Sequence, residues 1–177
     1  DLCGADIEFP RLPGNHLTRL KDALEPVLSQ ANFDIIVIDC PPSLSVLTLN
    51  AFVAARWLLI PLQCEYYALE GVSMIMRIFN HICESEESCK LELLGVLMTM
   101  FDGRTRLSQQ VVADVREYFK EKVFDTLIPR AVRLAEAPSF GKPVMYYDAY
   151  SAGTSAYGVL AEEVLSKLKI KKWKTRN

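Results

Sequence analysis

The sequence NFDIIVIDCPPSL, at residues 32–44, constrains the fold more than any other stretch of the chain. Its central run, IIVI, is apolar and ends at Asp39, and prolines follow at positions 41 and 42. An apolar run without polar alternation predicts a strand buried on both faces, which is typical of a parallel sheet covered by helices on each side. We therefore expect a strand over residues 33–39 inside an α/β protein.

The rest of the chain alternates between helical and strand-like patterns, in a length that suits one domain. Helices are expected over residues 15–31, 44–55, 68–83, 107–119 and 151–169, and further strands over residues 56–62, 91–101 and 123–129. Pro26 predicts a kink or an early end in the first helix. Loops are expected over residues 84–88 and 130–147. Because alternating strands and helices form βαβ units, the expected fold class is α/β, with a mostly parallel sheet flanked by helices.

Charge is distributed unevenly along the chain. The net charge is −2, yet residues 166–177 hold six basic side chains and no acidic one, so the remainder is distinctly acidic. An acidic body excludes a general nucleic-acid binder, and any such contact must come from local basic groups. The basic tail, residues 169–177, has three readings: an interfacial membrane helix, additional nucleic-acid affinity, or a solvated tail.

The five cysteines form no C-x-x-C pair, and the chain has only two histidines. An odd number of cysteines, some of them in or beside strand-like runs, favours reduced thiols packed as small apolar side chains. This pattern is typical of a cytosolic protein and disfavours a disulfide framework or a zinc site.

Several polar residues follow the expected strands directly. Ligands of parallel α/β sheets bind at the carboxyl ends of the strands, where Asp39, Gln63, residues 99–102 and Arg130 should lie. A carboxylate at the end of an apolar strand can hold Mg²⁺ beside nucleotide phosphates. The alternative for Asp39 is that it caps the following helix, since acidic residues often end strands.

Four blocks in order resemble the Soj/ParA family of chromosome- and plasmid-partitioning ATPases, within the MinD-like, deviant-Walker-A group of P-loop proteins. The blocks are FDIIVIDCPPSLSVLTLNAF, IPLQCEYYALEG, GVLMTMFDGRTRL and IPRAVRLAEAPSFGKPVMYYD. The resemblance extends over residues 4–168. It implies an incomplete P-loop ATPase domain over residues 1–168, without its N-terminal strand and phosphate-binding loop, followed by the basic tail.

The resemblance also implies a function and a set of site residues. The family binds ATP and Mg²⁺, dimerises in the ATP state, binds DNA non-specifically and hydrolyses ATP with a ParB partner, in the cytoplasm on the nucleoid. Carried over by motif, the nucleotide-site residues are Asp39 for the metal, Pro41 and Pro42 for the switch, and Pro129, Arg130 and Met98 for the nucleotide. Met98 has the alternative of a core residue, and Arg130 that of a solvated surface residue.

The DNA-binding face implied by the same resemblance contains Arg104 and Arg133, with Arg106 and Lys142 as weaker additions. Guanidinium groups contact backbone phosphates without reading sequence, which gives salt-sensitive, non-specific affinity. For each residue the alternative is a surface cation without a partner. The stretch SAGTSAY lacks the basic residue expected near Ala152, which would weaken the contact with DNA.

One departure from the family limits the expected activity. The chain has no K-G-G-x-G-K-[ST]-[ST] loop, and its only Gly-Lys pair, at 141–142, precedes a proline. Without that loop there is no cradle of backbone N–H groups for phosphates, so we expect the chain alone neither to bind ATP tightly nor to hydrolyse it. The chain begins with Asp1, as a fragment or a processed product would. The alternatives are a catalytically silent DNA- or partner-binding paralogue and a MinD-like positioning ATPase at the membrane.

Overall fold

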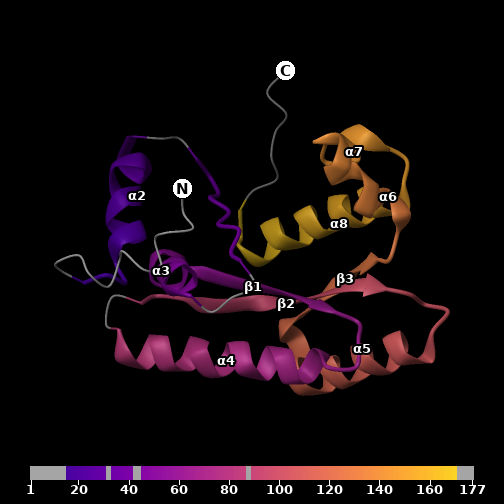
Figure 1. Cartoon of the computed structure of the whole chain (residues 1–177), viewed down its shortest axis with the longest axis horizontal. Helices are drawn as coiled ribbons and strands as arrows, with labels where there is room; N and C mark the ends of the chain where they lie inside the picture. The colour runs from indigo at the N-terminus through magenta and orange to yellow at the C-terminus, as the bar shows by residue number, and fades with distance from the viewer. Residues whose placement is uncertain (1–14, 31–32, 42–44, 87–88, 171–177) are drawn as a thin grey trace. The chain divides into compact units, whose positions relative to one another are not determined.

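The computed structural model describes residues 15–30, 33–41, 45–86 and 89–170 (Figure 1). The chain divides into two compact units. Unit 1 comprises Asp1–Leu58 and Met74–Leu93, and unit 2 comprises Leu59–Ser73 and Leu94–Asn177. The expected boundary between a domain at 1–168 and a tail at 169–177 stays a prediction, since residues 171–177 lie outside the described part.

The sheet contains β1 (Trp57–Gln63), β2 (Glu92–Phe101) and β3 (Val123–Pro129), in the order β1-β2-β3. β2 and β3 run parallel, with Val96 opposite Val123. These strands lie within one residue of the expected ranges, and the mostly parallel sheet flanked by helices is confirmed.

The expected strand over residues 33–39 is wrong. Residues 33–41 form no helix or strand, and Val37 is 85% exposed although it lies in the middle of the apolar run. A strand needs a neighbour that completes its backbone hydrogen bonds, and no ladder within the described ranges includes this segment. The sequence pattern therefore marks apolar side chains suited to burial, but in this structure they are solvent-exposed.

In unit 1, a buried asparagine of α3 (Val46–Ala54) forms hydrogen bonds to the backbone at the start of α2 (Arg19–Gln30). The Asn50 amide nitrogen donates to the carbonyl oxygens of His16 at 2.8 Å and Val46 at 2.9 Å, and its oxygen accepts from the Leu20 N–H at 3.1 Å. All three bonds are made in a nearly dry environment, where an unpaired amide is costly. The helix α2 continues past Pro26 to Gln30 and does not end early.

The core of unit 1 gathers around α3 and the last turns of α4 (Ala68–Ser85). Its buried members are Phe52, Val53, Ile82 and Leu91. One face of the long helix contributes to this contact, since Ile75, Ile78 and Phe79 pack against the same cluster.

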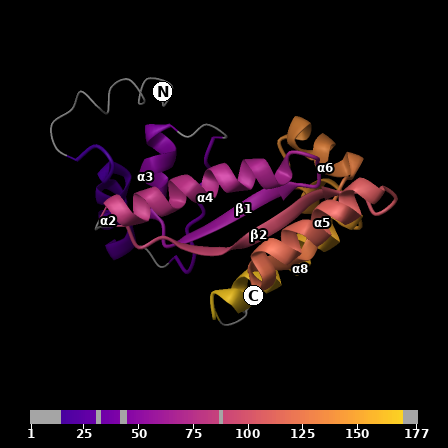
Figure 2. The ribbon, with the colours of Figure 1, turned by 90° about the horizontal axis from the view of Figure 1, so that it is seen from below.

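In unit 2, α5 (Arg106–Phe119) and α8 (Ala152–Lys167) cover opposite faces of the sheet (Figures 1 and 2). Each begins at a side-chain cap. Thr105 Oγ1 accepts from the Ser108 N–H at 3.3 Å, and Ser151 Oγ accepts from the Thr154 N–H at 3.2 Å. Phe124 of β3, with no exposed surface, is central to a cluster that includes Leu160 of α8. Packing of both faces explains why the strands of this sheet are apolar.

Short helices interrupt the segment after β3, where the sequence predicted only a loop. The 3-10 turn η3 (Lys120–Lys122) precedes β3, and α6 (Val132–Glu136), η4 (Ala137–Phe140) and α7 (Val144–Tyr147) follow it. Gly141 ends η4 with φ 62°, a left-handed conformation that glycine adopts without strain. Across the described residues, no helix is both long and apolar enough to cross a membrane.

Candidate functional site

A cavity of about 850 Å³ opens in unit 2 at the carboxyl ends of β1 and β2. This is where ligands bind in parallel α/β sheets, and the volume suits a ligand of nucleotide size. The lining combines acidic, basic and aromatic side chains, and comes from the loop after β1, the first turn of α4, the loop after β2, the start of α5 and the end of β3. It includes Glu65, Tyr66, Tyr67, Asp102, Thr105, Ser108 and Arg130.

β2 is irregular at its end, just before Asp102. The register between β2 and β3 shifts between Met98 and Phe101, and Met100 has φ 51°, which is unusual for a residue with a side chain. Backbone bonds hold both sides of the irregularity, since Thr99 O accepts from Cys64 N–H at 3.0 Å and Phe101 O accepts from Arg130 N–H at 2.9 Å. The three strand ends are thereby fixed to one another at the cavity.

Asp102 is the first residue after β2 and is bound by Arg104. The guanidinium donates to both carboxylate oxygens, through Nε at 2.9 Å and NH2 at 2.8 Å, and the Arg104 backbone N–H adds a bond of 3.0 Å. These bonds, with a smaller contribution from Arg130, lower the pKa of Asp102 to about 2. The carboxylate is therefore charged at any physiological pH.

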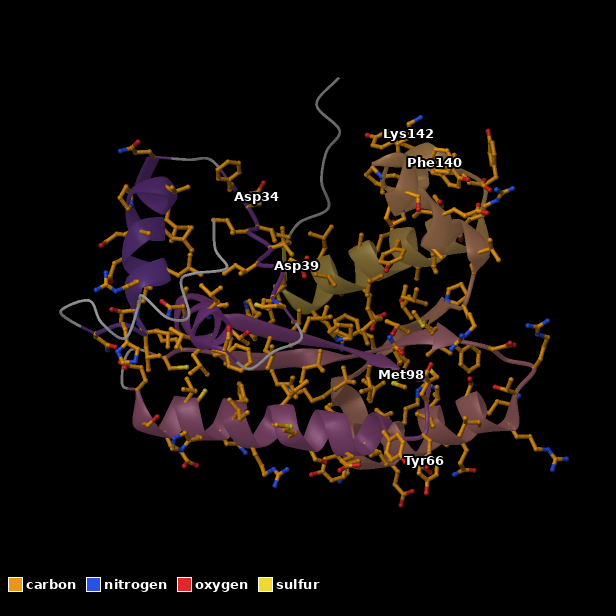
Figure 3. The ribbon with its side chains drawn as sticks, viewed as in Figure 1. Asp34, Asp39, Tyr66, Met98, Phe140 and Lys142 are labelled. Atoms are coloured by element: carbon orange, nitrogen blue, oxygen red, sulfur yellow. The ribbon has the colours of Figure 1, made fainter. Side chains whose placement is uncertain are left out.

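Arg130, the residue after β3, reaches across the cavity to the loop after β1. Its NH2 lies 3.0 Å from Glu65 Oε1, and both side chains are just over half exposed. An exposed pair of this kind contributes little to stability, but it presents a planar guanidinium at the cavity rim. The rings of Tyr66 and Tyr67, edge to face at 5.1 Å, follow directly after Glu65, and Figure 3 shows Tyr66 in this loop.

The other residues expected near a nucleotide lie differently. Pro129 is the half-buried last residue of β3, directly before Arg130. Met98 has no exposed surface, and Figure 3 places it within the sheet. Met98 is therefore not available at the surface, whereas Met100 is 43% exposed.

Asp39 and Pro41 lie in unit 1, on the irregular segment that precedes α3. Both are exposed. Figure 3 shows Asp39 on this segment. The structure gives the cap of α3 to Ser45, whose hydroxyl accepts from the Leu47 N–H at 3.3 Å, so the alternative role of Asp39 as a helix cap is wrong. Pro42 lies outside the described residues.

The four cations assigned to a DNA-binding face all lie in unit 2 and are solvent-exposed. Arg104, with a side chain 90% exposed, and Arg106 follow β2; Arg133 is in α6, and Lys142 lies just after η4, as Figure 3 shows. Arg133 contacts Glu136 at 3.0 Å and Asp148 at 3.3 Å. Both Arg104 and Arg133 therefore have acidic partners that a phosphate would have to displace.

Sequence reasoning found one of the two acidic residues that line the cavity. Asp102 was expected among residues 99–102 at the strand ends, whereas Glu65, two residues after β1, was not expected as a site residue. Asp102 pairs with Arg104 of its own loop, and Glu65 pairs with Arg130, which follows a different strand. A pair between separate loops leaves no local pattern in the sequence, which is why Glu65 was missed.

Comparison with known proteins supplies the family context. The family described as AAA domain matches residues 1–93. The chain is 48% identical over 167 residues to the chromosome partitioning protein ParA of Caulobacter vibrioides, covering 94% of this chain and 62% of that protein. It is also 48% identical to the sporulation initiation inhibitor protein Soj of Bacillus subtilis, covering 92% and 63% of the two chains.

The fold is also similar to that of a solved structure. The chain superposes with a TM-score of 0.75 on cobyrinic acid a,c-diamide synthase from Mycobacterium smegmatis with bound ADP and magnesium. The two sequences are 32% identical, and the match covers 98% of this chain and 64% of the other. The chain thus spans a little under two thirds of the length of the proteins it matches.

Proposed function

Because the chain belongs to the ParA/Soj family of chromosome partitioning proteins, within the AAA domain family, we propose that it forms part of an ATP-controlled DNA-segregation protein. In this proposal the protein dimerises when ATP is bound, binds DNA without sequence preference and acts with a ParB-like partner on the nucleoid in the cytoplasm. The single observation that carries it is 48% identity over 94% of the chain.

The cavity of unit 2 is our candidate for the base side of the nucleotide site. Its volume fits a nucleotide, and Arg130 after Pro129 offers a flat guanidinium on which a purine can stack. Met100, rather than the buried Met98, is the exposed methionine at this end of β2. Asp39 is the candidate ligand for Mg²⁺, since an exposed carboxylate is a hard oxygen donor, and Pro41 with Pro42 would form the stiff switch beside it.

The phosphates of ATP have no comparable site in this sequence. The 177 residues contain no G-x-x-x-x-G-K-[ST] motif, and backbone N–H groups with a lysine are what such a loop supplies. We therefore propose that the 177-residue chain alone holds ATP weakly and does not hydrolyse it. Calorimetric titration with ATP and Mg²⁺ tests this, and a dissociation constant in the micromolar range would overturn it.

The DNA-binding part of the proposal depends on Arg104 and Arg133, with Arg106 and Lys142 adding charge. Local cations on an otherwise acidic chain give contacts to phosphates and none to base edges. The expected result is equal retention of two unrelated duplexes in a filter-binding assay, lost in both cases as salt rises. A preference for one duplex that survives at high salt would contradict this mode of binding.

The second candidate is a catalytically silent module that keeps the fold and the DNA or partner face. It is compatible with the 177 residues, which contain no phosphate-binding loop motif. The coding region upstream of Asp1 separates the two candidates. A glycine-rich loop with a lysine there favours the ATP-controlled protein, and its absence favours the silent module. A MinD-like membrane role is disfavoured by the block VRLAEAPSFGKP.

A further inference from the structure

Two cysteines of unit 1 lie in contact, and neither lines the cavity of unit 2. Cys83 is in the last turn of α4, Cys89 precedes β2, and their sulfur atoms are 3.4 Å apart. Both side chains are half-buried, so small solutes can reach them. All four described cysteines are free thiols, and among them this is the pair whose sulfur atoms touch.

The surroundings of the pair hold the two thiols toward each other. Cys83 Sγ donates to the carbonyl oxygen of Leu91 at 3.6 Å, and Cys89 Sγ lies 4.0 Å from the carbonyl oxygen of Phe52. Phe52 and Leu91 are buried members of the core of unit 1, and both cysteines pack against that core. Packing against this core therefore holds both cysteine side chains in place. The two sulfur atoms need to approach by about 1.4 Å to reach the bond length of a disulfide, about 2.05 Å.

We propose that Cys83 and Cys89 form a dithiol modification site that a small disulfide, such as oxidised glutathione, closes reversibly to an intramolecular disulfide. Cys89 thiolate attacks one glutathione sulfur, forms a mixed disulfide and releases one glutathione thiolate. Cys83 then loses its proton and attacks the Cys89 sulfur, which releases the second glutathione. The two protein thiols lose two electrons and two protons, and the glutathione disulfide takes them up as two thiols.

This order of attack follows from the environment of Cys83. Burial, then the hydrogen bond to Cys89 and the charge of Glu84, raises the pKa of Cys83 to about 11. A thiol that is hardly ionised at neutral pH is a poor first nucleophile, but it can complete an exchange once its partner holds a mixed disulfide. Cys83 is therefore assigned the second, disulfide-closing step.

The other described thiols provide internal references. Cys40 is exposed and Cys64 is buried, and burial raises the pKa of each. Among the described cysteines neither touches a second sulfur, so neither is expected to close a disulfide with another described thiol.

The test is equilibration of the full 177-residue chain with a glutathione redox buffer, followed by acid quenching, alkylation and peptide mapping. We expect an internal Cys83–Cys89 disulfide, formed with an equilibrium constant about tenfold or more above that of the same chain in concentrated guanidinium chloride. The comparison is needed because two cysteines so close in sequence also meet in an unfolded chain. The matched variant Cys89→Ser should show no internal disulfide at Cys83.

Two outcomes would overturn the proposal. One is an equilibrium constant in native buffer equal to or below that in denaturant, because the fold would then not favour closure. The other is accumulation of mixed disulfides on Cys83 and Cys89 without closure. Circular dichroism on the same samples establishes that the native samples are folded, so neither outcome can arise from an unfolded chain. The redox equilibration and the circular dichroism measurement involve neither ATP nor DNA, so their results are independent of the proposed function.

Discussion

The Glu163 carboxylate of α8 accepts hydrogen bonds from backbone N–H groups of β3. It accepts from the N–H groups of Asp125 at 2.8 Å and Thr126 at 3.0 Å, and from the Thr126 hydroxyl at 2.7 Å. Burial acts to raise its pKa, but the bonds from Thr126 and Asp125 outweigh burial and hold the pKa below its ordinary value. One side chain thus satisfies two donors of a strand at the edge of the sheet.

We expect Glu163→Gln to lower the free energy of unfolding by about 1 kcal/mol at neutral pH, because the carboxylate is partly solvated and the amide keeps one acceptor. A lowered folded-state pKa gives stability that is present above the unfolded pKa of glutamate, about 4.3, and lost as pH falls through the folded value. The difference between wild type and variant should therefore shrink below about pH 4. Denaturant unfolding across pH measures it, with Glu117→Gln, an exposed residue of α5, as the control. A difference that grows on acidification would contradict this role.

Helix α8 ends in a way that its sequence does not favour. Lys169 has φ 56°, its N–H donates to Ser166 O at 3.0 Å, and the Ile170 N–H donates to Leu165 O at 3.0 Å. This bonding pattern is a Schellman motif, in which glycine usually occupies the left-handed position. A lysine there keeps the bonds but carries the strain of its Cβ.

Lys169→Gly should therefore stabilise the chain by about 0.5–1 kcal/mol, measured by denaturant unfolding. Lys169→Ala is the control, since it removes the same side chain but retains the Cβ. If both variants have the same stability, the left-handed ending of α8 is not a source of strain.

Strand β2 has a glycine at position 95, where the Lys122 carbonyl and the Phe124 ring leave no room for a Cβ. A Cβ built at Gly95 would lie 2.5 Å from the Lys122 carbonyl oxygen and 2.8 Å from the Phe124 ring. Gly95→Ala should lower the free energy of unfolding by about 2 kcal/mol, because backbone and a buried ring must both move. Gly158→Ala in α8, where a Cβ would meet nothing within 4 Å, should instead stabilise the chain by about 0.5–1 kcal/mol. Equal effects of the two substitutions would contradict the packing described for β2.

Pattern reasoning succeeded for elements whose partners lie within the described chain. The strands β1, β2 and β3 and the helices α4, α5 and α8 were predicted within two residues, since each shows an apolar pattern that its neighbours cover. The segment 33–39 has the same pattern but no neighbouring strand among the described residues, and a pattern cannot reveal whether a partner is present. The cavity was only partly predicted, because the ion pair of Glu65 with Arg130 joins side chains from separate loops.

At the scale of the whole molecule, both units contain residues assigned to the proposed function. Unit 2 holds the cavity and the four candidate cations, and unit 1 holds Asp39 on its exposed segment. The sequence similarity to ParA and Soj extends over nearly the whole chain, so it includes residues of both units. The cysteine pair lies in unit 1 and is not assigned a role in the proposed function.

The most direct test of the DNA-binding proposal is the salt dependence of affinity for a duplex of arbitrary sequence. We expect Arg104→Ala with Arg133→Ala to weaken binding and to reduce the slope of log K against log salt by about 2, because each substitution removes one guanidinium that neutralises a phosphate. The matched control removes two other exposed arginines, Arg77→Ala with Arg116→Ala, and should leave the slope unchanged. An unaltered slope in the first variant, or no measurable binding by the wild-type chain at low salt, would contradict the proposal.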